Sequence, residues 1–282
     1  EYKQEGLLIM NITLLKNTCR TTIVILILLF YLPTSTKAQS EEILEIADIA
    51  VTPDNCGDLS VIKGVSGKVQ YNPQTKVLIL ENATINITDG HGIYSEVKGL
   101  IIKLVGTSNI LAKKAAIGFR EALTITGGGT LNVESVEDCA FYAIETDLTI
   151  DNCVVNAKSS LYGISGNSSS SEKLTIRHAT VTAEGTKRGS IRDFAAFELI
   201  GCNITQPSGA VFNSAKHCVE LNGTMVKEKV VITKDPTGLD IPNAEKVSRP
   251  KVYTLNGICV QGELENQPTG VYIVNGKKIV KK

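Results

Sequence analysis

Residues 148–155 read Leu-Thr-Ile-Asp-Asn-Cys-Val-Val, and residues 174–181 read Leu-Thr-Ile-Arg-His-Ala-Thr-Val. Both stretches place apolar or small residues at offsets 0, 2, 5 and 7. Because side chains alternate along a strand, offsets 0 and 2 lie on the same side. The odd step from 2 to 5 then requires a corner between two short strands, whereas a helix would need offsets of 3 and 4. The pattern therefore indicates two strands joined by a tight corner.

Six copies of this pattern lie between Leu78 and Gln206, beginning at residues 78, 102, 123, 148, 174 and 197. Each copy is followed by a small residue and an apolar β-branched one, at Gly92-Ile93, Ala116-Ile117, Ala143-Ile144, Gly163-Ile164, Ser190-Ile191 and Ala210-Val211. A unit thus has three short strands, and a period of this length is typical of stacked repeats. We expect an all-β protein with a right-handed, single-stranded parallel β-helix of about six coils over residues 77–233.

Stacking predicts which residues fill the interior. One inward row is expected to hold Leu78, Leu123, Leu148, Leu174 and Phe197, and a second Leu80, Ile125, Ile150, Ile176 and Leu199. Small residues are expected at the corner, namely Ala83, Cys153, Ala179 and Cys202. Cys153 and Cys202 would lie two coils apart, about 10 Å, which is too far for a disulfide. Residues 39–76 are expected to form an N-terminal segment with a hairpin that caps the first coil.

The N-terminus has the features of a secretory signal over residues 1–38. Lys16 and Arg20 precede a 12-residue apolar run at 21–32, and Thr36-Lys37-Ala38 fits a cleavage site before Gln39. Met10 is the expected start, with residues 1–9 as an upstream extension. A membrane anchor is the alternative, although the run is shorter than the roughly 20 residues that a span needs. We expect a secreted or cell-surface, outer-membrane-associated protein whose mature chain has no stable membrane span.

The C-terminus predicts a linker at 234–247 and a small antiparallel β-domain at 248–282. Asn256-Gly257 and Asn275-Gly276 each separate two short apolar strands, as in hairpins with type I′ turns. The stretches KVYTLNGICV (251–260) and PTGVYIVNGKKIVKK (268–282) resemble the C-terminal sorting domain that Bacteroidetes attach to cargo of the type IX secretion system. This resemblance implies recognition by the secretion machinery through residues 248–282. The alternative is a capping β-domain with no role in secretion.

The coil region also resembles a known group. The stretches GKVQYNPQTKVLILENATI (67–85), LTIDNCVVNA (148–157) and LTIRHATVTA (174–183) are similar to carbohydrate-binding parallel β-helix domains of secreted bacterial proteins, within the wider pectate-lyase-like group. The resemblance implies binding of acidic plant polysaccharides, in some members with calcium; no other cofactor is expected. The chain carries 29 basic and 29 acidic residues, and this balance argues against a nucleic-acid partner.

Outward residues of the coils are the candidates for a glycan site. Arg177, Lys187, Arg188 and Arg192 fall within one coil and could meet a carboxylated or sulfated glycan. Aromatic residues near the third strand could stack on sugar rings or fill the core, and core is the interpretation for Phe119 and Phe212. The predicted carbohydrate-binding residues are Tyr142, Tyr162, Arg177, Arg188 and Arg192. An ion pair between Asp151 and Arg177 on adjacent strands is the alternative for Arg177.

Catalytic residues are not predicted. Asp89-Gly90-His91-Gly92 resembles the Gly-His-Gly of polygalacturonase-like hydrolases, but their Asn-Thr-Asp, Asp-Asp and Arg-Ile-Lys motifs are absent from the sequence. The motif is interpreted as the small-residue turn before Ile93. Single acidic residues near coil starts (Glu121, Asp147, Asp151, Glu172) are interpreted as solvated corners, so no metal ligands are predicted.

Three functions remain open from the sequence. The first is a non-catalytic, exported protein that binds a polysaccharide or host glycan. The second is a lyase or hydrolase of uronic-acid polymers, and the third is a structural or adhesin-like spacer.

Overall fold

The computed structural model describes residues 42–167, 170–235, 252–260, 264, 267–274 and 277–281. The signal segment 1–38 and all but two residues of the linker 234–247 lie outside these ranges. Within them, no helix has the length and apolarity needed to cross a membrane.

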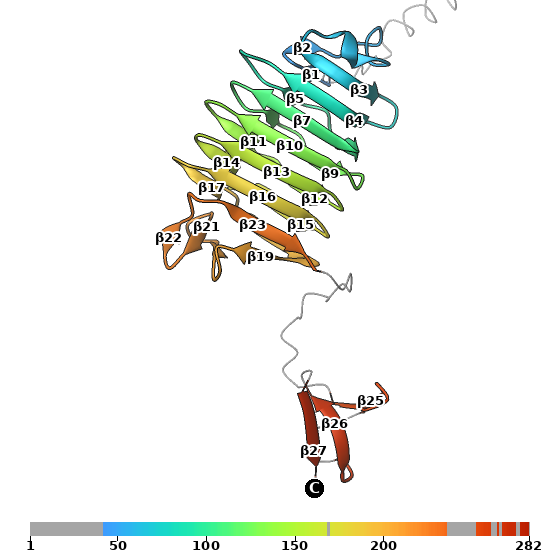
Figure 1. The fold of residues 1–282 in the computed structure, drawn as a ribbon, viewed down its shortest axis with the longest axis vertical. Coiled ribbons are helices and arrows are strands. Elements are labelled where there is room, and N and C mark those ends of the chain that lie inside the picture. Colours follow the sequence, from blue (N-terminus) through green and yellow to red (C-terminus); the bar gives the residue numbers. More distant parts are fainter. Residues whose placement is uncertain are drawn as a thin grey trace, which may run out of the picture. The chain divides into compact units, whose positions relative to one another are not determined.

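The predicted all-β class and parallel β-helix are confirmed. Strands of successive turns stack side by side into a solenoid of about five turns, with three strands to a turn (Figure 1). Face 1 contains β5 (Ile93–Ser95), β8 (Ile117–Phe119), β11 (Cys139–Ala143), β14 (Tyr162–Ser165) and β17 (Gly189–Arg192). Face 2 contains β6 (Leu100–Val105), β9 (Leu123–Thr126), β12 (Leu148–Asp151), β15 (Lys173–Arg177) and β18 (Ala196–Ile200). Face 3 contains β7 (Thr107–Ala112), β10 (Thr130–Ser135), β13 (Val154–Ser159) and β16 (Thr180–Gly185).

The corner between faces 2 and 3 explains the odd step in the repeat. Asn152 and His178 have φ of 48° and 46°, the left-handed conformation that Asn and His adopt more readily than most residues. The next residues, Cys153 and Ala179, are 5% and 1% exposed. The left-handed residue reverses the alternation, so that the second apolar pair also points inward.

Interior rows run through the whole stack. Leu100, Leu123, Leu148, Leu174 and Phe197 are in register, and so are Leu78, Ile102, Ile125, Ile150, Ile176 and Leu199. These residues are buried except for Phe197 and Leu199, which are partly buried and pack against the core.

The expected register was wrong for the first coil, because Leu78 lies in the row of Ile125 and not in that of Leu123. The third coil turns earlier than the first two, at three glycines that follow Thr126. A Cβ on Gly127 would lie 2.6 Å from the carbonyl oxygen of Leu104, so the glycine is needed for this earlier corner. Leu80 and Leu104 therefore form a separate inward pair.

Two positions of the third-strand signal were also wrong. In the third coil Phe141, not Ile144, is in register with Ile117 and Ile164. In the sixth copy Val211 is 57% exposed and lies on an antiparallel strand.

The sixth copy leaves the solenoid after β18. Its next strand, β19 (Cys202–Gln206), does not stack on β16, because β23 (Val230–Lys234) lies between them and is antiparallel to both. Pro207, which follows β19, has no N–H to donate to a ladder. β20 (Val211–Asn213), β21 (Cys218–Leu221) and β22 (Thr224–Met225) continue as antiparallel strands, and β21 pairs with β17. The parallel stack ends where these antiparallel strands begin.

The first coil is covered by antiparallel strands. β3 (Val65–Asn72) pairs with β4 (Val77–Asn86), a strand that belongs to both face 2 and face 3. β1 (Leu44–Ile46) pairs with β5 and with β2 (Ile49–Ala50), and a short 3-10 helix (η1, Leu59–Val61) precedes β3.

A separate four-stranded antiparallel sheet contains β24 (Val252–Thr254), β25 (Cys259–Val260), β26 (Gly270–Val274) and β27 (Lys277–Lys281). The type I′ turn expected at Asn256-Gly257 was wrong. Of these two residues only Gly257 has a positive φ, and its N–H donates to the Thr254 carbonyl at 3.0 Å. The second Asn-Gly pair, Asn275-Gly276, lies outside the described residues, although β26 and β27 pair on either side of it.

Candidate functional site

The outer side of face 1 holds a row of matched positions. Strand alternation turns Ile93, Ile117, Phe141, Ile164 and Ile191 into the core, where all are buried. The next residue of each strand lies on the outer side, and these residues are in register: Tyr94, Gly118, Tyr142, Ser165 and Arg192, here called the tyrosine row. Tyr94, Tyr142 and Arg192 are partly exposed, whereas Gly118 and Ser165 are buried. Tyr94 and Tyr142 are two strand spacings apart, about 10 Å.

Tyr94 is held by charged neighbours. Its hydroxyl donates to Glu96 Oε1 at 2.5 Å and accepts from Arg120 Nε at 3.0 Å. Its ring reaches over Gly118, where an added Cβ would lie 3.5 Å from Tyr94 Cδ2. Partial burial, followed by the hydrogen bond to Glu96, raises the pKa of the Tyr94 hydroxyl. The small residue at Gly118 thus leaves room for the tyrosine ring.

Tyr142 is positioned by the loop after β14. Its hydroxyl donates to Asn167 Oδ1 at 2.5 Å, and partial burial raises its pKa. The loop is organised by Glu172, whose carboxylate accepts backbone N–H groups of Asn167, Ser170 and Ser171 at 3.1, 3.1 and 3.2 Å. Glu172 is fully buried, so its interpretation as a solvated corner was wrong. A single anionic acceptor satisfies several backbone N–H groups of this loop at once, which fixes the loop beside Tyr142.

Tyr162 and Arg192 form a cation–π pair. The Arg192 guanidinium carbon lies 5.4 Å from the centre of the Tyr162 ring. Arg192 donates to Asp193 through Nε at 2.6 Å and Nη2 at 2.8 Å, and to the Arg188 carbonyl through Nη1 at 3.0 Å. The hydrogen bond with Asp193 is the main cause that raises the pKa of Arg192. Arg192 therefore fixes Tyr162, while its charge is balanced by Asp193.

Two exposed cations lie in the turn that leads into β17. Lys187 and Arg188 are both exposed, and neither side chain has a hydrogen bond or ion pair with another residue that the structure describes. Their charges are available to a ligand at this edge of face 1.

Arg177 lies elsewhere. It ends β15 on face 2, where its Nη2 is 2.8 Å from Asp151 Oδ2 on the adjacent coil. This hydrogen bond holds the pKa of Asp151 below its ordinary value. Of the five residues predicted for carbohydrate binding, Tyr142, Tyr162, Arg188 and Arg192 come together at face 1, whereas Arg177 does not.

The other aromatic candidates lie in the interior of the solenoid or pack against the core at its last coil. Phe119 and Phe194 are fully buried. Phe212 is half-buried, and its ring centre lies 5.4 Å from that of Phe197.

His91 lies beside the start of the tyrosine row, with its ring centre 5.9 Å from that of Tyr94. Its Nδ1 is 3.3 Å from Asp48 Oδ1, which also accepts the His91 backbone N–H at 3.0 Å. Gly90 has a φ of 115°, and Ile93 lies in the inward row. These contacts account for the Gly-His-Gly motif as a turn.

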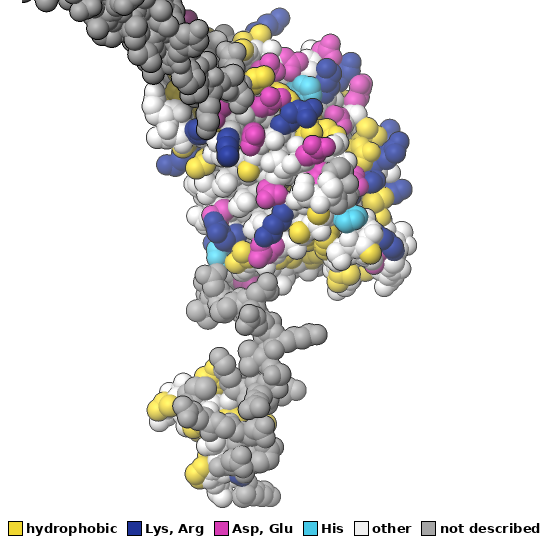
Figure 2. All heavy atoms as spheres, turned by 180° about the vertical axis from the view of Figure 1, so that it is seen from behind, with side chains coloured by type: hydrophobic (Ala, Val, Ile, Leu, Met, Phe, Trp, Pro, Cys, Tyr) yellow, Lys and Arg dark blue, Asp and Glu magenta, His cyan; other side chains and the backbone are white. Residues whose placement is uncertain are grey.

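Charges elsewhere on the solenoid are interspersed. In the view of Figure 2, acidic and basic side chains alternate without a large patch of one sign. Pairs on adjacent coils, such as Lys158–Glu134 at 3.4 Å and Lys173–Glu198 at 2.6 Å, explain part of this alternation. Within the described part of the chain, no cluster of three or more His, Cys, Asp or Glu residues could hold a metal ion.

The geometry is that of a β-solenoid, consistent with the pectate-lyase-like fold. No family model, no curated protein and no solved structure matches the chain.

Proposed function

We propose that the protein is a non-catalytic carbohydrate-binding protein and that it binds an extended acidic glycan along the outer side of face 1. The observation that carries this proposal is the tyrosine row with the neighbouring Tyr162. Tyr94 and Tyr142 lie outward on face 1, and Tyr162 begins the strand beside them and contacts Arg192 of the same row. Each of the three rings is half-buried and held by a defined polar or cationic partner. Fixed aromatic rings offer apolar area to a sugar at a low cost in conformational entropy.

The spacing fits a polymer. A gap of about 10 Å between Tyr94 and Tyr142 is comparable with the length of a disaccharide, so both rings can contact one extended chain. The exposed cations Lys187 and Arg188 favour a carboxylated or sulfated chain. Arg177 is not part of this proposed site, because it lies on face 2 and is paired with Asp151.

A glycan array probed with the full chain tests the proposal, with calcium and with a chelator. We expect binding to acidic glycans, and the double variant Lys187→Met/Arg188→Met should weaken it. The matched control is Lys98→Met/Lys103→Met, which removes two exposed lysines near face 2. Absence of binding in both conditions, or equal loss in the control, would contradict the proposal.

One observation favours a second candidate, a lyase or hydrolase. The Asp48–His91 pair adjoins the tyrosine row, and a histidine held by a carboxylate can act as a general base. We expect no unsaturated product and no new reducing ends when the full chain is incubated with pectins or glycosaminoglycans. Product formation that is lost in His91→Ala would establish the enzyme instead.

Export to the cell surface belongs to the same proposal. It is supported by the apolar run at 21–32 and by the resemblance of the C-terminal strands to a sorting domain. Cell fractionation of the full chain and of a chain ending at residue 247 tests it. Equal surface amounts of the two chains would remove the sorting role.

A further inference from the structure

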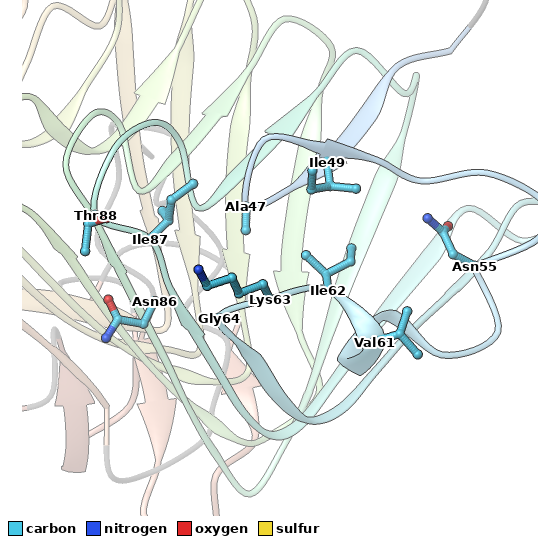
Figure 3. A pocket seen from close by; sticks show the side chains of 10 residues that line it. All are labelled: Ala47, Ile49, Asn55, Val61, Ile62, Lys63, Gly64, Asn86, Ile87 and Thr88. Carbon is cyan, nitrogen blue, oxygen red and sulfur yellow. The ribbon is translucent and has the colours of Figure 1, made fainter.

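A second candidate site lies at the N-terminal end of the solenoid, apart from the tyrosine row. The segment before β3 and the chain after β4 enclose a cleft of about 800 Å³, with Ala47 and Ile49 on its other side (Figure 3). This volume is within the range of small-molecule sites, about 300–1,000 Å³. None of the residues of the tyrosine row lines the cleft.

Gly64 brings the two main walls together. It has a φ of 88°, and a Cβ at this position would lie 2.3 Å from the Asn86 carbonyl oxygen. The Asn86 N–H donates to the Gly64 carbonyl at 2.8 Å. This close crossing places Lys63 inside the cleft, since the residue before the glycine faces the end of β4.

One end of the cleft is mainly aliphatic, with Asn55 beside Val61 and Ile62 (Figure 3). Ile49 and Val61 are 50% and 71% exposed, so their aliphatic surface is accessible to a ligand in the cleft. Ile62 and Ile49 approach each other across the cleft in Figure 3. The lining contains no aromatic side chain, so this wall suits an alkyl chain better than a sugar ring.

The other end carries a positive charge and polar groups, with Ile87 between Asn86 and Thr88 (Figure 3). The side chain of Lys63 extends toward Asn86 and Thr88 (Figure 3). Among the described residues, none makes a hydrogen bond or ion pair with the side chains of Lys63, Asn86 and Thr88. Lys63 is the one charged residue of the lining. An anion bound here would contact the Lys63 ammonium group, and no carboxylate in the lining of the cleft competes for it.

We propose that this cleft binds a single-chain amphiphile with an anionic head group. The alkyl chain lies against Ile49, Val61 and Ile62, and the head accepts hydrogen bonds from Lys63 and Asn86. Burial of the chain gives affinity through the aliphatic wall, and the charge-assisted hydrogen bond selects an anionic head. This site is independent of glycan binding at face 1.

Isothermal titration of the full chain tests the proposal, with every amphiphile below its micelle concentration. Laurate should bind with one site for each chain, and dodecyl phosphate shows whether the head is restricted to carboxylates. Dodecanol and dodecyltrimethylammonium should bind at least about tenfold more weakly, because they lack the anion that Lys63 contacts. Acetate should not bind, because it lacks the alkyl chain.

Two variants and one control complete the test. Lys63→Met should weaken the binding of laurate about tenfold or more while leaving the affinity for dodecanol unchanged. Val61→Asp should weaken the binding of both amphiphiles. This substitution does not disturb the core because Val61 is exposed. Lys229→Met, an exposed lysine at the opposite end of the solenoid, is the matched control. Laurate that binds no tighter than dodecanol, or an affinity unchanged in Lys63→Met or Val61→Asp, would overturn the proposal.

Discussion

Replacement of Glu172 by glutamine tests the loop that positions Tyr142. One carboxylate oxygen accepts from Ser170 and Ser171 and the other from Asn167. Glutamine keeps one acceptor oxygen and replaces the other with an NH2 group. At least one backbone N–H would therefore face a second donor instead of an acceptor. Hydrogen bonds to charged groups contribute about 1.5–3 kcal/mol each, and the glutamine amide lacks the charge of the buried carboxylate.

We therefore expect Glu172→Gln to lower the free energy of unfolding by about 2–4 kcal/mol. In a domain of this size the loss corresponds to a thermal midpoint lower by about 5–10 °C. Thermal and urea unfolding followed by circular dichroism measure it. Glu121→Gln, at an exposed glutamate that has no partner among the described residues, should change stability by less than about 0.5 kcal/mol.

Glu172→Asp separates charge from reach. Aspartate keeps the anion but is one methylene shorter, so it should lose less stability than glutamine. If Glu172→Gln unfolds at the same midpoint as the unmodified chain and Glu121→Gln, Glu172 does not organise the loop and the reasoning fails.

Three further perturbations concern the core, an ion pair and the thiols. Ile150→Ala removes a fully buried side chain and should cost about 2–5 kcal/mol in urea unfolding; a loss below about 1 kcal/mol would contradict the stacked core. The pKa of Asp151 is lowered, so its pair with Arg177 contributes its full stabilisation when the pH is above the ordinary pKa of an aspartate. This contribution is lost as the pH falls through the lowered pKa of Asp151. Arg177→Met should return that pKa toward its ordinary value in an NMR titration, and an unchanged pKa would exclude the pairing. Burial raises the pKa of Cys153 to about 12. At neutral pH iodoacetamide should therefore modify the half-exposed Cys56 well before Cys153. Equal modification rates of the two thiols, measured by peptide mass mapping, would contradict the burial of Cys153.

The repeat was sufficient to predict the scaffold because its offsets follow directly from strand geometry. Leu148 and Ile150 are interior for the reason that the sequence suggested, and Cys153 is a small buried residue with a free thiol. The register of the first coil was not predictable in this way. It depends on where the chain turns, and the turn at Gly127 is set by close contact with Leu104 on the neighbouring coil.

The candidate site was predicted in part. Tyr142 and Tyr162 were identified because each lies near the third-strand signal, and Arg192 because it belongs to a group of basic residues within one coil. Arg177 was grouped with them because it belongs to the same coil as Arg192, but one coil wraps around all three faces. Proximity in sequence therefore does not give proximity on the surface of a solenoid.

The burial of Glu172 was not predicted, because its polar neighbours in the sequence suggested an exposed position. The serine-rich stretch before it was a usable signal, since a tight loop leaves several backbone N–H groups that need an acceptor. The open end of the solenoid was also unpredictable from the repeat. The sixth copy keeps the pattern, but β23 returns from later in the chain and takes the position beside β16.

The most direct test of glycan binding at face 1 compares two variants by titration with the acidic glycan that binds most tightly on the array. Tyr142→Ala removes one ring of the tyrosine row, and Arg177→Met removes a cation on face 2. If the glycan binds at face 1, Tyr142→Ala should weaken binding about tenfold or more, and Arg177→Met should change it by less than about twofold. A large loss of affinity in Arg177→Met with little change in Tyr142→Ala would place the ligand on face 2 and contradict binding at face 1.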